Sequence, residues 1–390
     1  MSADLNIAII GCGIGGLACA IYLSRAGHDV TVFDKFDTPK PVGSGLVIQP
    51  VGQDVLAELG VMETITARSA PIFKMTGHEA RSGRSVLNVD YGPEGGDTFG
   101  LGLHRGAIFM ALYEAAQKER LSWKLGTEII SSDLRGETRF IASDRGEEFG
   151  PYDLVIDASG AGSKLSPIKT RALSYGALWG TVDWPSDTPL HPKRLTQCYK
   201  RASHMMGILP LGAPQEGDAQ KAAIFWSEPR AALPDWPNTN IDQLREKAVA
   251  LWPEYAPFAA QIRSTDDLTP ALYAHGTLSK PYGPRLAFIG DAAHQASPQL
   301  GQGANMALLD ARALCQEIEA RGINALPAYA RRRKWHVALY QLFSRVFTPY
   351  YQSDSRLLPI LRDNIMNPLS YIWPVRPMLT RLVCGTLIKP

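Results

Sequence analysis

The sequence predicts an α/β fold in which a parallel sheet is interwoven with a mixed, largely antiparallel layer and followed by a helical C-terminal region. Three observations lead to this prediction. A buried-strand pattern, a glycine-rich turn and a helix follow one another near the N-terminus. A second strand, loop and helix come near residue 286, and short β-like runs broken by Pro and Gly fill the chain between them. The chain therefore moves between two layers twice.

The composition is that of an ordinary globular protein large enough for one big two-layer domain or two joined domains. The chain has 390 residues, of which 45% are hydrophobic and 20% charged. Forty basic and thirty-eight acidic residues leave a formal charge of +2. This balance favours neither a nucleic-acid partner nor an anionic membrane surface. The basic run 331–334 is interpreted as a solvated helix face.

The five cysteines predict neither a disulfide framework nor a metal site, because they are odd in number, scattered and never in C-x-x-C spacing. The apolar run from Leu5 to Leu23 is about as long as a spanning helix. However, it holds four glycines within six residues and follows Asp4. We therefore expect a buried strand, a turn and a helix, with no integral membrane segment, no signal peptide and a cytoplasmic location.

The N-terminal elements form a βαβ unit. We expect a strand at 7–10, a turn at 11–16, a helix at 17–26 and a second strand at 29–33. The turn reads G-x-G-x-x-G: Gly11 permits the turn, Gly13 lets the backbone approach a pyrophosphate, and Gly16 lets helix and strand pack closely. Asp34 can accept hydrogen bonds from ribose hydroxyls. The unit predicts dinucleotide binding, with Gly15 also in the contacting turn, and occurs only once.

Further elements are predicted along the chain. A helix begins at Arg105, the run 154–156 rejoins the parallel sheet, and 171–285 forms an inserted antiparallel layer with one helix near 241–252. A buried strand at 286–289 precedes a helix with apolar residues at helical spacing. The last sixty residues are punctuated by Pro349, Pro359, Pro368, Pro374 and Pro377 and predict short helices that pack over the substrate cavity.

The stretch GDAAHQASPQLGQGANMA at 290–307 decides which dinucleotide is expected. Asp291 follows a strand at the edge where ligands bind in α/β sheets, and could accept from sugar-alcohol hydroxyls. The backbone at Gly301, Gln302 and Gly303 could approach a flat ring, with the positive end of the next helix near its oxygen. A flavin, which becomes anionic on reduction, gains most from this, so FAD is favoured over NAD.

Three stretches together resemble the FAD-dependent aromatic hydroxylases, the class A flavoprotein monooxygenases similar to p-hydroxybenzoate hydroxylase. They are G-x-G-x-x-G at 11–16, DLVIDASGAGS at 153–163 and GDAAHxxxPxxGQGxN at 290–305. HRGAIFMAL from 104 and GSGLVIQP over 43–50 extend the resemblance over nearly the whole chain. The FAD contacts implied by it are Lys35, Gly45, Val47, Arg105, Asp291, Pro298, Gly301, Gln302, Gly303 and Asn305. Pro298 would lie beside flavin C4a and N5, shaping the oxygen pocket.

The resemblance implies an enzyme in which NADH or NADPH docks transiently and reduces a mobile flavin. O2 then forms a flavin C4a-hydroperoxide that hydroxylates a small aromatic or electron-rich substrate. One departure is that Ser159 stands where the family has Asp, and Asp157 where Gly is usual. Three interpretations stay open: Asp157 compensates from the same face of a strand, a separate flavin reductase supplies electrons, or Ser159 is a neutral replacement.

These predictions divide the chain into an FAD-binding part at 1–170 with inserted strands near 70–100, a substrate-binding β layer at 171–284, a second FAD-binding part at 285–325 and a helical region at 326–390. Candidate substrate contacts in the β layer are Tyr199, His204, Met206 and Trp226. His294 is expected to lock its loop. Alternative functions are another flavin reaction on the same scaffold (reductase, cyclase or halogenase) and a catalytically silent FAD-binding protein.

Overall fold

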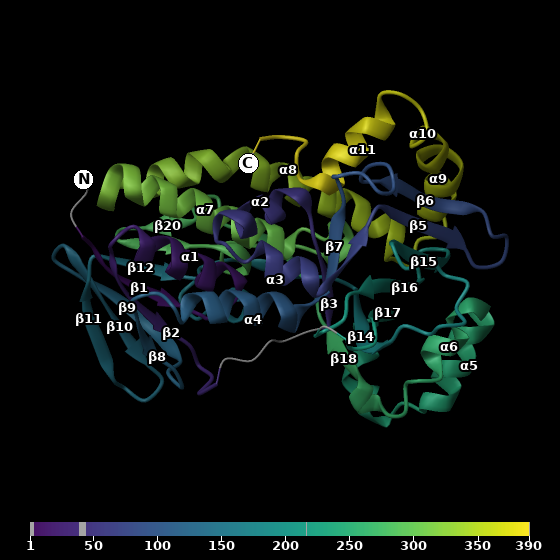
Figure 1. Cartoon of the computed structure of the whole chain (residues 1–390), viewed down its shortest axis with the longest axis horizontal. Helices are drawn as coiled ribbons and strands as arrows, with labels where there is room; N and C mark the ends of the chain where they lie inside the picture. Colours follow the sequence, from purple (N-terminus) through teal and green to yellow (C-terminus); the bar gives the residue numbers. More distant parts are fainter. Residues whose placement is uncertain (1–3, 39–43, 216, 390) are drawn as a thin grey trace.

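The structure, a computed structural model, describes residues 4–38, 44–215 and 217–389. The stretch expected to begin at Gly43 is therefore described from Ser44 onward. Figure 1 shows a parallel sheet with its covering helices toward one end of the molecule and a second large sheet toward the other. The C-terminal helices lie along the upper side in this view. The predicted α/β architecture with two interwoven layers is confirmed.

The parallel sheet is built from chain segments far apart in the sequence. Its strand order is β20-β21-β12-β1-β2-β8, with only β20 antiparallel to its neighbour. The strands are β1 (Asn6–Ile10), β2 (Asp29–Phe33), β8 (Leu121–Lys124), β12 (Leu154–Asp157), β20 (Tyr282–Gly283) and β21 (Leu286–Phe288). Their runs of Ile, Val and Leu are buried on both faces, as in other parallel sheets covered by helices. The predictions for β1, β2, β12 and β21 are confirmed.

Helices from three parts of the chain form the core with this sheet. Helix α1 (Ile14–Arg25) packs against α4 (Arg105–Ala116) and α7 (Gly303–Arg321). Helix α1 begins three residues earlier than predicted, because Ile14, Gly15 and Gly16 already have helical conformation. Two shorter helices, α2 (Pro50–Glu58) and α3 (Met62–Ala67), follow strand β3 (Gly45–Ile48). The helix predicted from Arg105 begins at that residue.

The second large sheet has seven strands in the order β18-β14-β17-β16-β15-β5-β6. They are β5 (Lys74–Glu79), β6 (Ser85–Asp90), β14 (Tyr175–Asp183), β15 (Arg194–Lys200), β16 (His204–Leu211), β17 (Lys221–Pro229) and β18 (Leu268–Ala271). The β layer predicted from 171 onward thus supplies five strands, and β5 and β6 from the earlier part of the chain complete the edge. Helices α5 (Ile241–Leu251) and α6 (Ala256–Ala259) cover one face, and α5 agrees with the helix predicted near 241–252.

Three small sheets contain the remaining strands that the structure describes. The first is β3-β7-β4, formed by β3 (Gly45–Ile48), β4 (Ser69–Ile72) and β7 (Gly100–His104). The second is β9 (Ile129–Arg135), β10 (Thr138–Ser143) and β11 (Glu148–Tyr152), and the third is β13 (Thr170–Ala172), β19 (Ala274–Thr277) and β22 (His294–Gln295). Sheet β3-β7-β4 packs closely on the seven-stranded sheet. Gly45 in β3 lies so near to Ala223 in β17 that a Cβ on Gly45 would be 2.5 Å from the Ala223 Cβ. The two large layers are therefore joined through β3.

The C-terminal region differs from the prediction of short helices only. Helix α8 (Leu326–Tyr351) is 26 residues long and is followed by α9 (Leu358–Leu361), a π-helical segment (Arg362–Met366), α10 (Asn367–Leu369) and α11 (Val375–Cys384). Pro349 does not prevent α8, because it lies two residues from the end, where its missing N–H affects only the last turn. In the described part of the chain, no helix is both long and apolar enough to span a membrane. All five cysteines are buried free thiols.

Candidate functional site

The glycine turn contains two glycines that the fold requires, Gly11 and Gly16, and one, Gly13, that lies beside open space. Gly11 has φ +103°, and a Cβ there would lie 2.7 Å from the Ala158 carbonyl oxygen. A Cβ on Gly16 would lie 2.0 Å from the Gly11 oxygen. Gly13 has an ordinary φ of −71°, and its Cβ would meet only the Ala158 oxygen at 4.0 Å. Gly11 and Gly16 thus let strand, turn and helix pack, whereas space beside Gly13 is left for a ligand.

Asp34 lies immediately after β2 and holds the turn. Its carboxylate accepts hydrogen bonds from the Cys12 amide at 2.7 Å and the Phe36 amide at 2.9 Å. Burial, together with the nearby charge of Asp34, raises the pKa of the Cys12 thiol. Lys35 is exposed, with its ammonium 5.1 Å from the centroid of the Phe36 ring. Asp34 is therefore fixed at the strand end where a ribose would bind.

The loop after β21 is anchored by a buried ion-pair cluster. Asp310 on α7 accepts from the Gly290 amide at 2.9 Å, from His294 Nε2 at 2.5 Å and from Arg333 Nε at 2.7 Å. Burial favours the neutral carboxyl, but His294 and Arg333 outweigh it and lower the pKa of Asp310. Burial likewise lowers the pKa of His294, but Asp310 reverses this and the net pKa is raised. His294 has the loop-locking position predicted for it.

This cluster corrects the interpretation of the basic run as a solvated face. Arg331, Arg332 and Lys334 are exposed, but Arg333 is only 2% exposed and contacts Asp310. A helix presents successive residues about 100° apart, so one member of the run turns inward. The guanidinium is buried because a carboxylate compensates its charge.

Asn305 joins the loop to β3. Its Oδ1 accepts from the Gln49 amide at 2.8 Å, and its Nδ2 donates to the carbonyl oxygens of Val47 at 3.1 Å and Gly301 at 3.0 Å. Asn305 is fully buried, and Gly301 has φ +60°, a conformation that favours glycine. The backbone of β3 and the backbone of the loop are therefore held at a fixed separation by one side chain.

The N-terminus of α7 has the features of an anion site. The helix begins at Gly303, and in the described residues no side chain caps it and no acid lies in its first turn. Gln302 instead donates through Nε2 to the Val383 carbonyl at 3.0 Å. A Cβ on Gly303 would meet nothing within 4 Å. The positive end of α7 is thus open beside Pro298, which starts the short turn Pro298–Leu300.

Two buried side-chain oxygens beside this loop favour a bound group. Gln49 Oε1 and Gln302 Oε1 have no hydrogen-bond partner among the described residues, although both side chains are buried. A buried oxygen without a partner is costly unless water or a ligand supplies a donor. These atoms, the uncapped helix and the space at Gly303 fit a flat ring that carries N–H groups and negative charge, as a flavin does.

Asp291 and Arg105 are electrostatically coupled. Asp291 lies at the start of a short turn, Gly290–Ala292, directly after β21. Its side chain keeps contact with solvent, yet enough protein surrounds it that desolvation raises its pKa, opposed by the positive charges of His294 and Arg105. Arg105 is exposed at the start of α4, where its amide donates to the Ser44 carbonyl. The positive charge of Arg105 is therefore within electrostatic range of the Asp291 carboxylate.

Asp157 does not have the role considered for it. Its side chain is fully buried and accepts from the Ser159 amide at 3.0 Å and from the hydroxyls of Ser159 and Ser163. Desolvation raises the pKa of Asp157, and these hydrogen bonds oppose the rise. The expectation of a shared strand face is wrong, because β12 ends at Asp157 and Ser159 lies in the following turn. Asp157 therefore supports the turn from inside, while Ser159 is exposed.

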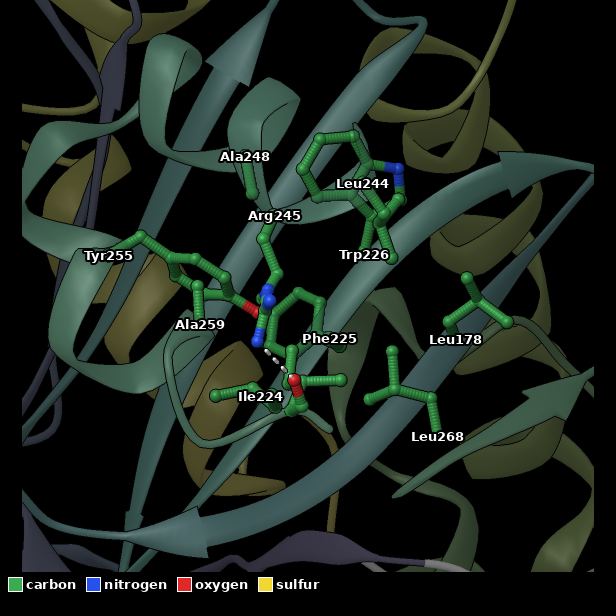
Figure 2. Close-up of a pocket in the computed structure, with 11 residues that line it drawn as sticks. Leu178, Ile224, Phe225, Trp226, Leu244, Arg245, Ala248, Tyr255, Ala259 and Leu268 are labelled. Carbon is green, nitrogen blue, oxygen red and sulfur yellow. Dashed lines mark hydrogen bonds between the residues drawn. The ribbon is translucent and has the colours of Figure 1, made fainter. Parts of the chain in front are cut away.

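Strand alternation corrects the substrate candidates. Met206 and Trp226 pack on the face covered by α5 and α6, and Trp226 lines the pocket beneath α5 shown in Figure 2. Neighbouring Met205 and Phe225 point to the opposite face. Tyr199 shares that face but is buried, with its hydroxyl bonded to Gln197 Oε1 at 2.6 Å. Met206 and Trp226 thus point away from the loop between Gly290 and Asn305.

The fourth candidate, His204, is half-buried at the first position of β16. Its Nδ1 lies 2.9 Å from the Ser203 hydroxyl, and burial lowers the pKa of the imidazole. The ring shares the strand parity of Met206 rather than that of Met205. His204 is therefore a less direct neighbour of the loop than its sequence position indicated.

The sequence did not predict the side chains that lie on the face of the seven-stranded sheet toward this loop. Gln299 Nε2 lies 3.7 Å from Met205 Sδ, which links the loop to the seven-stranded sheet. On the same face the rings of Trp179 and Phe225 are 4.7 Å apart, and Trp179 Nε1 donates to the Tyr273 hydroxyl at 2.6 Å. Only the alternation of Met205 and Met206 in β16 could have signalled this, and the sequence does not reveal which face is inward.

Comparison with known proteins assigns the family. The FAD binding domain family (FAD_binding_3) matches residues 4–335. The chain belongs to this family. The FAD-dependent monooxygenase atnJ of an Arthrinium species is 25% identical over 363 residues, covering 85% of this chain and 82% of that protein. Kynurenine 3-monooxygenase of Xanthomonas euvesicatoria pv. vesicatoria is 25% identical over 400 residues, covering 95% and 85%.

A solved structure supports the same fold. Klebsiella pneumoniae HpxO complexed with FAD and uric acid superposes with a TM-score of 0.80 at 20% identity, covering 98% of each chain. The protein is therefore an oxidoreductase of the FAD-dependent monooxygenase family, with an FAD-binding domain. The resemblance inferred from the three sequence stretches is confirmed at this level.

Proposed function

We propose that this flavoprotein uses NADH or NADPH and O2 to hydroxylate a small aromatic or similarly electron-rich compound. The observation that carries the proposal is the loop from Gly290 to Asn305, which is anchored to α7 by Asp310 and to β3 by Asn305. Such anchoring fixes the uncapped N-terminus of α7 relative to the seven-stranded sheet. A cofactor ring and a substrate would then meet at a constant distance.

Each part of the site has a separate task. Bound FAD supplies the activation of O2 and the transfer of one oxygen atom. The amides at the start of α7 would stabilise negative charge on the ring. Asp34 would accept from the ribose and Asp291 from the ribityl hydroxyls. Pro298, which has no N–H, would leave the adjacent surface free of a donor.

The substrate side supports an aromatic compound. The face toward the loop carries Met205, Phe225 and the Trp179–Tyr273 pair. Aromatic and thioether groups favour offset or edge contacts with an aromatic ring. Gln299 is the polar side chain from the loop nearest to this face, and it could orient a ring substituent. These residues replace Met206 and Trp226 as candidate substrate contacts.

The presence of Ser159 favours a second hypothesis for how the flavin is reduced. Ser159 is exposed and Asp157 is fully buried, so the carboxylate expected at 159 has no substitute at 157. A separate flavin reductase that supplies reduced flavin is therefore an alternative to direct reduction by NAD(P)H. We place the protein in the cytoplasm, where its five buried free thiols would persist.

The deciding experiment is anaerobic mixing of the FAD-loaded protein with NADH or NADPH, with and without candidate phenols, while flavin absorbance is followed. Substrate-stimulated bleaching followed by oxygen consumption supports a self-contained hydroxylase. No bleaching with either nucleotide, together with turnover when reduced FAD is added, supports a separate reductase. Absence of oxygen consumption with any reductant would leave a silent FAD-binding protein, and oxygen consumption without product hydroxylation would favour another flavin reaction.

Substitution of Ser159 provides a second test of how the flavin is reduced. Ser159→Asp should accelerate reduction by NAD(P)H if the missing carboxylate limits it. Ser159→Ala is the matched control, because it removes the hydroxyl bonded to Asp157 without adding a charge. Equal reduction rates in all three proteins would show that Ser159 is a neutral replacement.

A further inference from the structure

The segment from Leu357 to Trp373, which includes α9, the π-helical segment and α10, presents a row of exposed apolar side chains. Large side chains point outward at Leu357, Ile360, Ile365, Leu369, Ile372 and Trp373, with exposed fractions from 45% at Leu369 to 81% at Trp373. The opposite face is buried, with Pro359, Arg362 and Ser370 turned toward the protein. We call these six residues the apolar stripe. An amphipathic run normally turns its apolar face inward, so an outward stripe marks an interaction surface.

The π-helical segment keeps the stripe continuous. Ile360 and Ile365 are five residues apart, a spacing that would place them on different faces of an α-helix. The segment Arg362–Met366, which contains Ile365, is π-helical, with i→i+5 hydrogen bonding, and so turns Ile365 toward the face of Ile360. A helical spacing of four residues continues the stripe to Leu369, and Ile372 and Trp373 follow in the turn before α11. The local backbone thus preserves an exposed apolar line instead of interrupting it.

The C-terminal region that carries the stripe is basic as a whole, although the four basic residues 331–334 lie at the start of α8 rather than beside the stripe. Residues 326–390 contain ten Lys or Arg and two Asp, which leaves thirty basic and thirty-six acidic residues in 1–325. The near-neutral total therefore hides a basic C-terminal region on an acidic remainder. Within the described residues, Arg356 and Arg381 are exposed and have no carboxylate at salt-bridge distance. Their charges are available to an external anion.

We propose that the apolar stripe docks on the surface of an anionic phospholipid membrane, with the arginines beside it contacting the headgroups. Exposed Trp, Leu and Ile with flanking Arg are the combination that binds membrane interfaces without spanning them. A symmetric contact with a second copy is disfavoured, because it would bring the exposed Arg356 and Arg381 of both copies together. This inference extends beyond the proposed function and does not depend on turnover.

The test measures binding of the purified FAD-loaded protein to vesicles by co-sedimentation. One set contains phosphatidylcholine alone and the other phosphatidylcholine with phosphatidylglycerol. We expect binding to the anionic vesicles that weakens as salt is raised. Ile365→Ser with Leu369→Ser should reduce binding at least about tenfold. Arg356→Gln with Arg381→Gln should reduce binding to anionic vesicles about tenfold or more.

The matched control is Leu134→Ser, which removes an exposed leucine of similar exposure from β9 at the other end of the molecule in Figure 1. It should bind as the parent does, and circular dichroism should show that every variant is folded. Failure of the parent to bind anionic vesicles would overturn the proposal. So would a dimer, detected by sedimentation without vesicles, that the Ile365 and Leu369 substitutions dissociate, because a second copy would then cover the stripe.

Discussion

At the residue scale, Gly11 and Gly13 differ in what they are needed for. Gly13→Ala should leave the free energy of unfolding without FAD within about 1 kcal/mol, because its φ of −71° suits alanine and its Cβ would be unobstructed. FAD affinity should fall at least about tenfold, since the Cβ enters the space for the pyrophosphate. Equilibrium FAD titration and urea unfolding measure the two effects.

Gly11→Ala is the matched comparison. There the Cβ would clash with the Ala158 carbonyl and φ is +103°, so the protein should be destabilised even without FAD. If Gly13→Ala bound FAD as tightly as the parent, the pyrophosphate would not lie beside Gly13.

His294 makes stability depend on pH in a definite direction. Its pKa is raised in the folded protein by Asp310. The stabilisation is therefore fully present below the unfolded pKa of about 6.5 and is lost as pH rises through the folded value. Asp310 affects stability at acidic pH. Its lowered pKa stabilises the fold above about pH 4, and this stabilisation is lost as pH falls further.

We predict that His294→Gln flattens the alkaline side of this profile. Urea unfolding between pH 6 and pH 9, values chosen around the reference of about 6.5, should show a decline in the parent that is reduced in the variant. His191→Gln is the control, because that histidine is half-exposed beside Glu94 at the surface. An unchanged slope in His294→Gln would mean that the imidazole does not carry the dependence.

At the element scale, α8 is fixed to α7 by one inward-turned arginine. Arg333→Ala should destabilise the protein by about 3–5 kcal/mol, because Asp310 loses a buried partner. Arg331→Ala, two residues earlier and exposed, should change stability by no more than about 0.5 kcal/mol. Thermal and urea unfolding compare them directly. Similar losses in both variants would contradict the assignment of Arg333 as the sole inward member.

Strand β16 gives a second matched pair. Met205→Leu and Met206→Leu conserve volume, so each should cost less than about 1.5 kcal/mol of stability. Only Met205 faces the loop through Gln299, so only Met205→Leu should change KM or the ratio of product formed to NAD(P)H consumed. Steady-state kinetics with an accepted substrate is the measurement. A larger kinetic effect at Met206 would place the substrate on the α5 side.

These pairs show which features of the elements could be predicted from sequence. The strands of the parallel sheet and the glycine turn have local signatures, because a strand buried on both faces is apolar throughout. Whether Met205 or Met206 faces inward depends on which sheet face another layer covers, and Arg333 turns inward only because Asp310 lies opposite. Both are tertiary facts. The motif-bearing residues were therefore predicted, and their supporting partners were not.

At the scale of the whole molecule, the candidate cofactor site draws on four separate parts of the chain. Its candidate residues come from the first βαβ unit, from β3, from α4 and from the loop before α7. FAD should thus stabilise the complete fold, by about 2.7 kcal/mol at a free concentration one hundred times its Kd. Unfolding with and without FAD tests this by a shift in midpoint at an unchanged denaturant slope. A separate transition for residues beyond 171 would show that the β layer is uncoupled from the cofactor.

The buried cysteines have a consequence for an enzyme that handles O2. Oxygen that is reduced but not transferred leaves as hydrogen peroxide, which attacks thiolates. Burial raises the pKa of Cys12, Cys198, Cys315 and Cys384, so these thiols stay protonated as well as covered. Cys12 lies in the glycine turn itself, between Gly11 and Gly13. If the protein has the proposed function, the burial of these thiols would limit their oxidation by peroxide from unproductive turnovers.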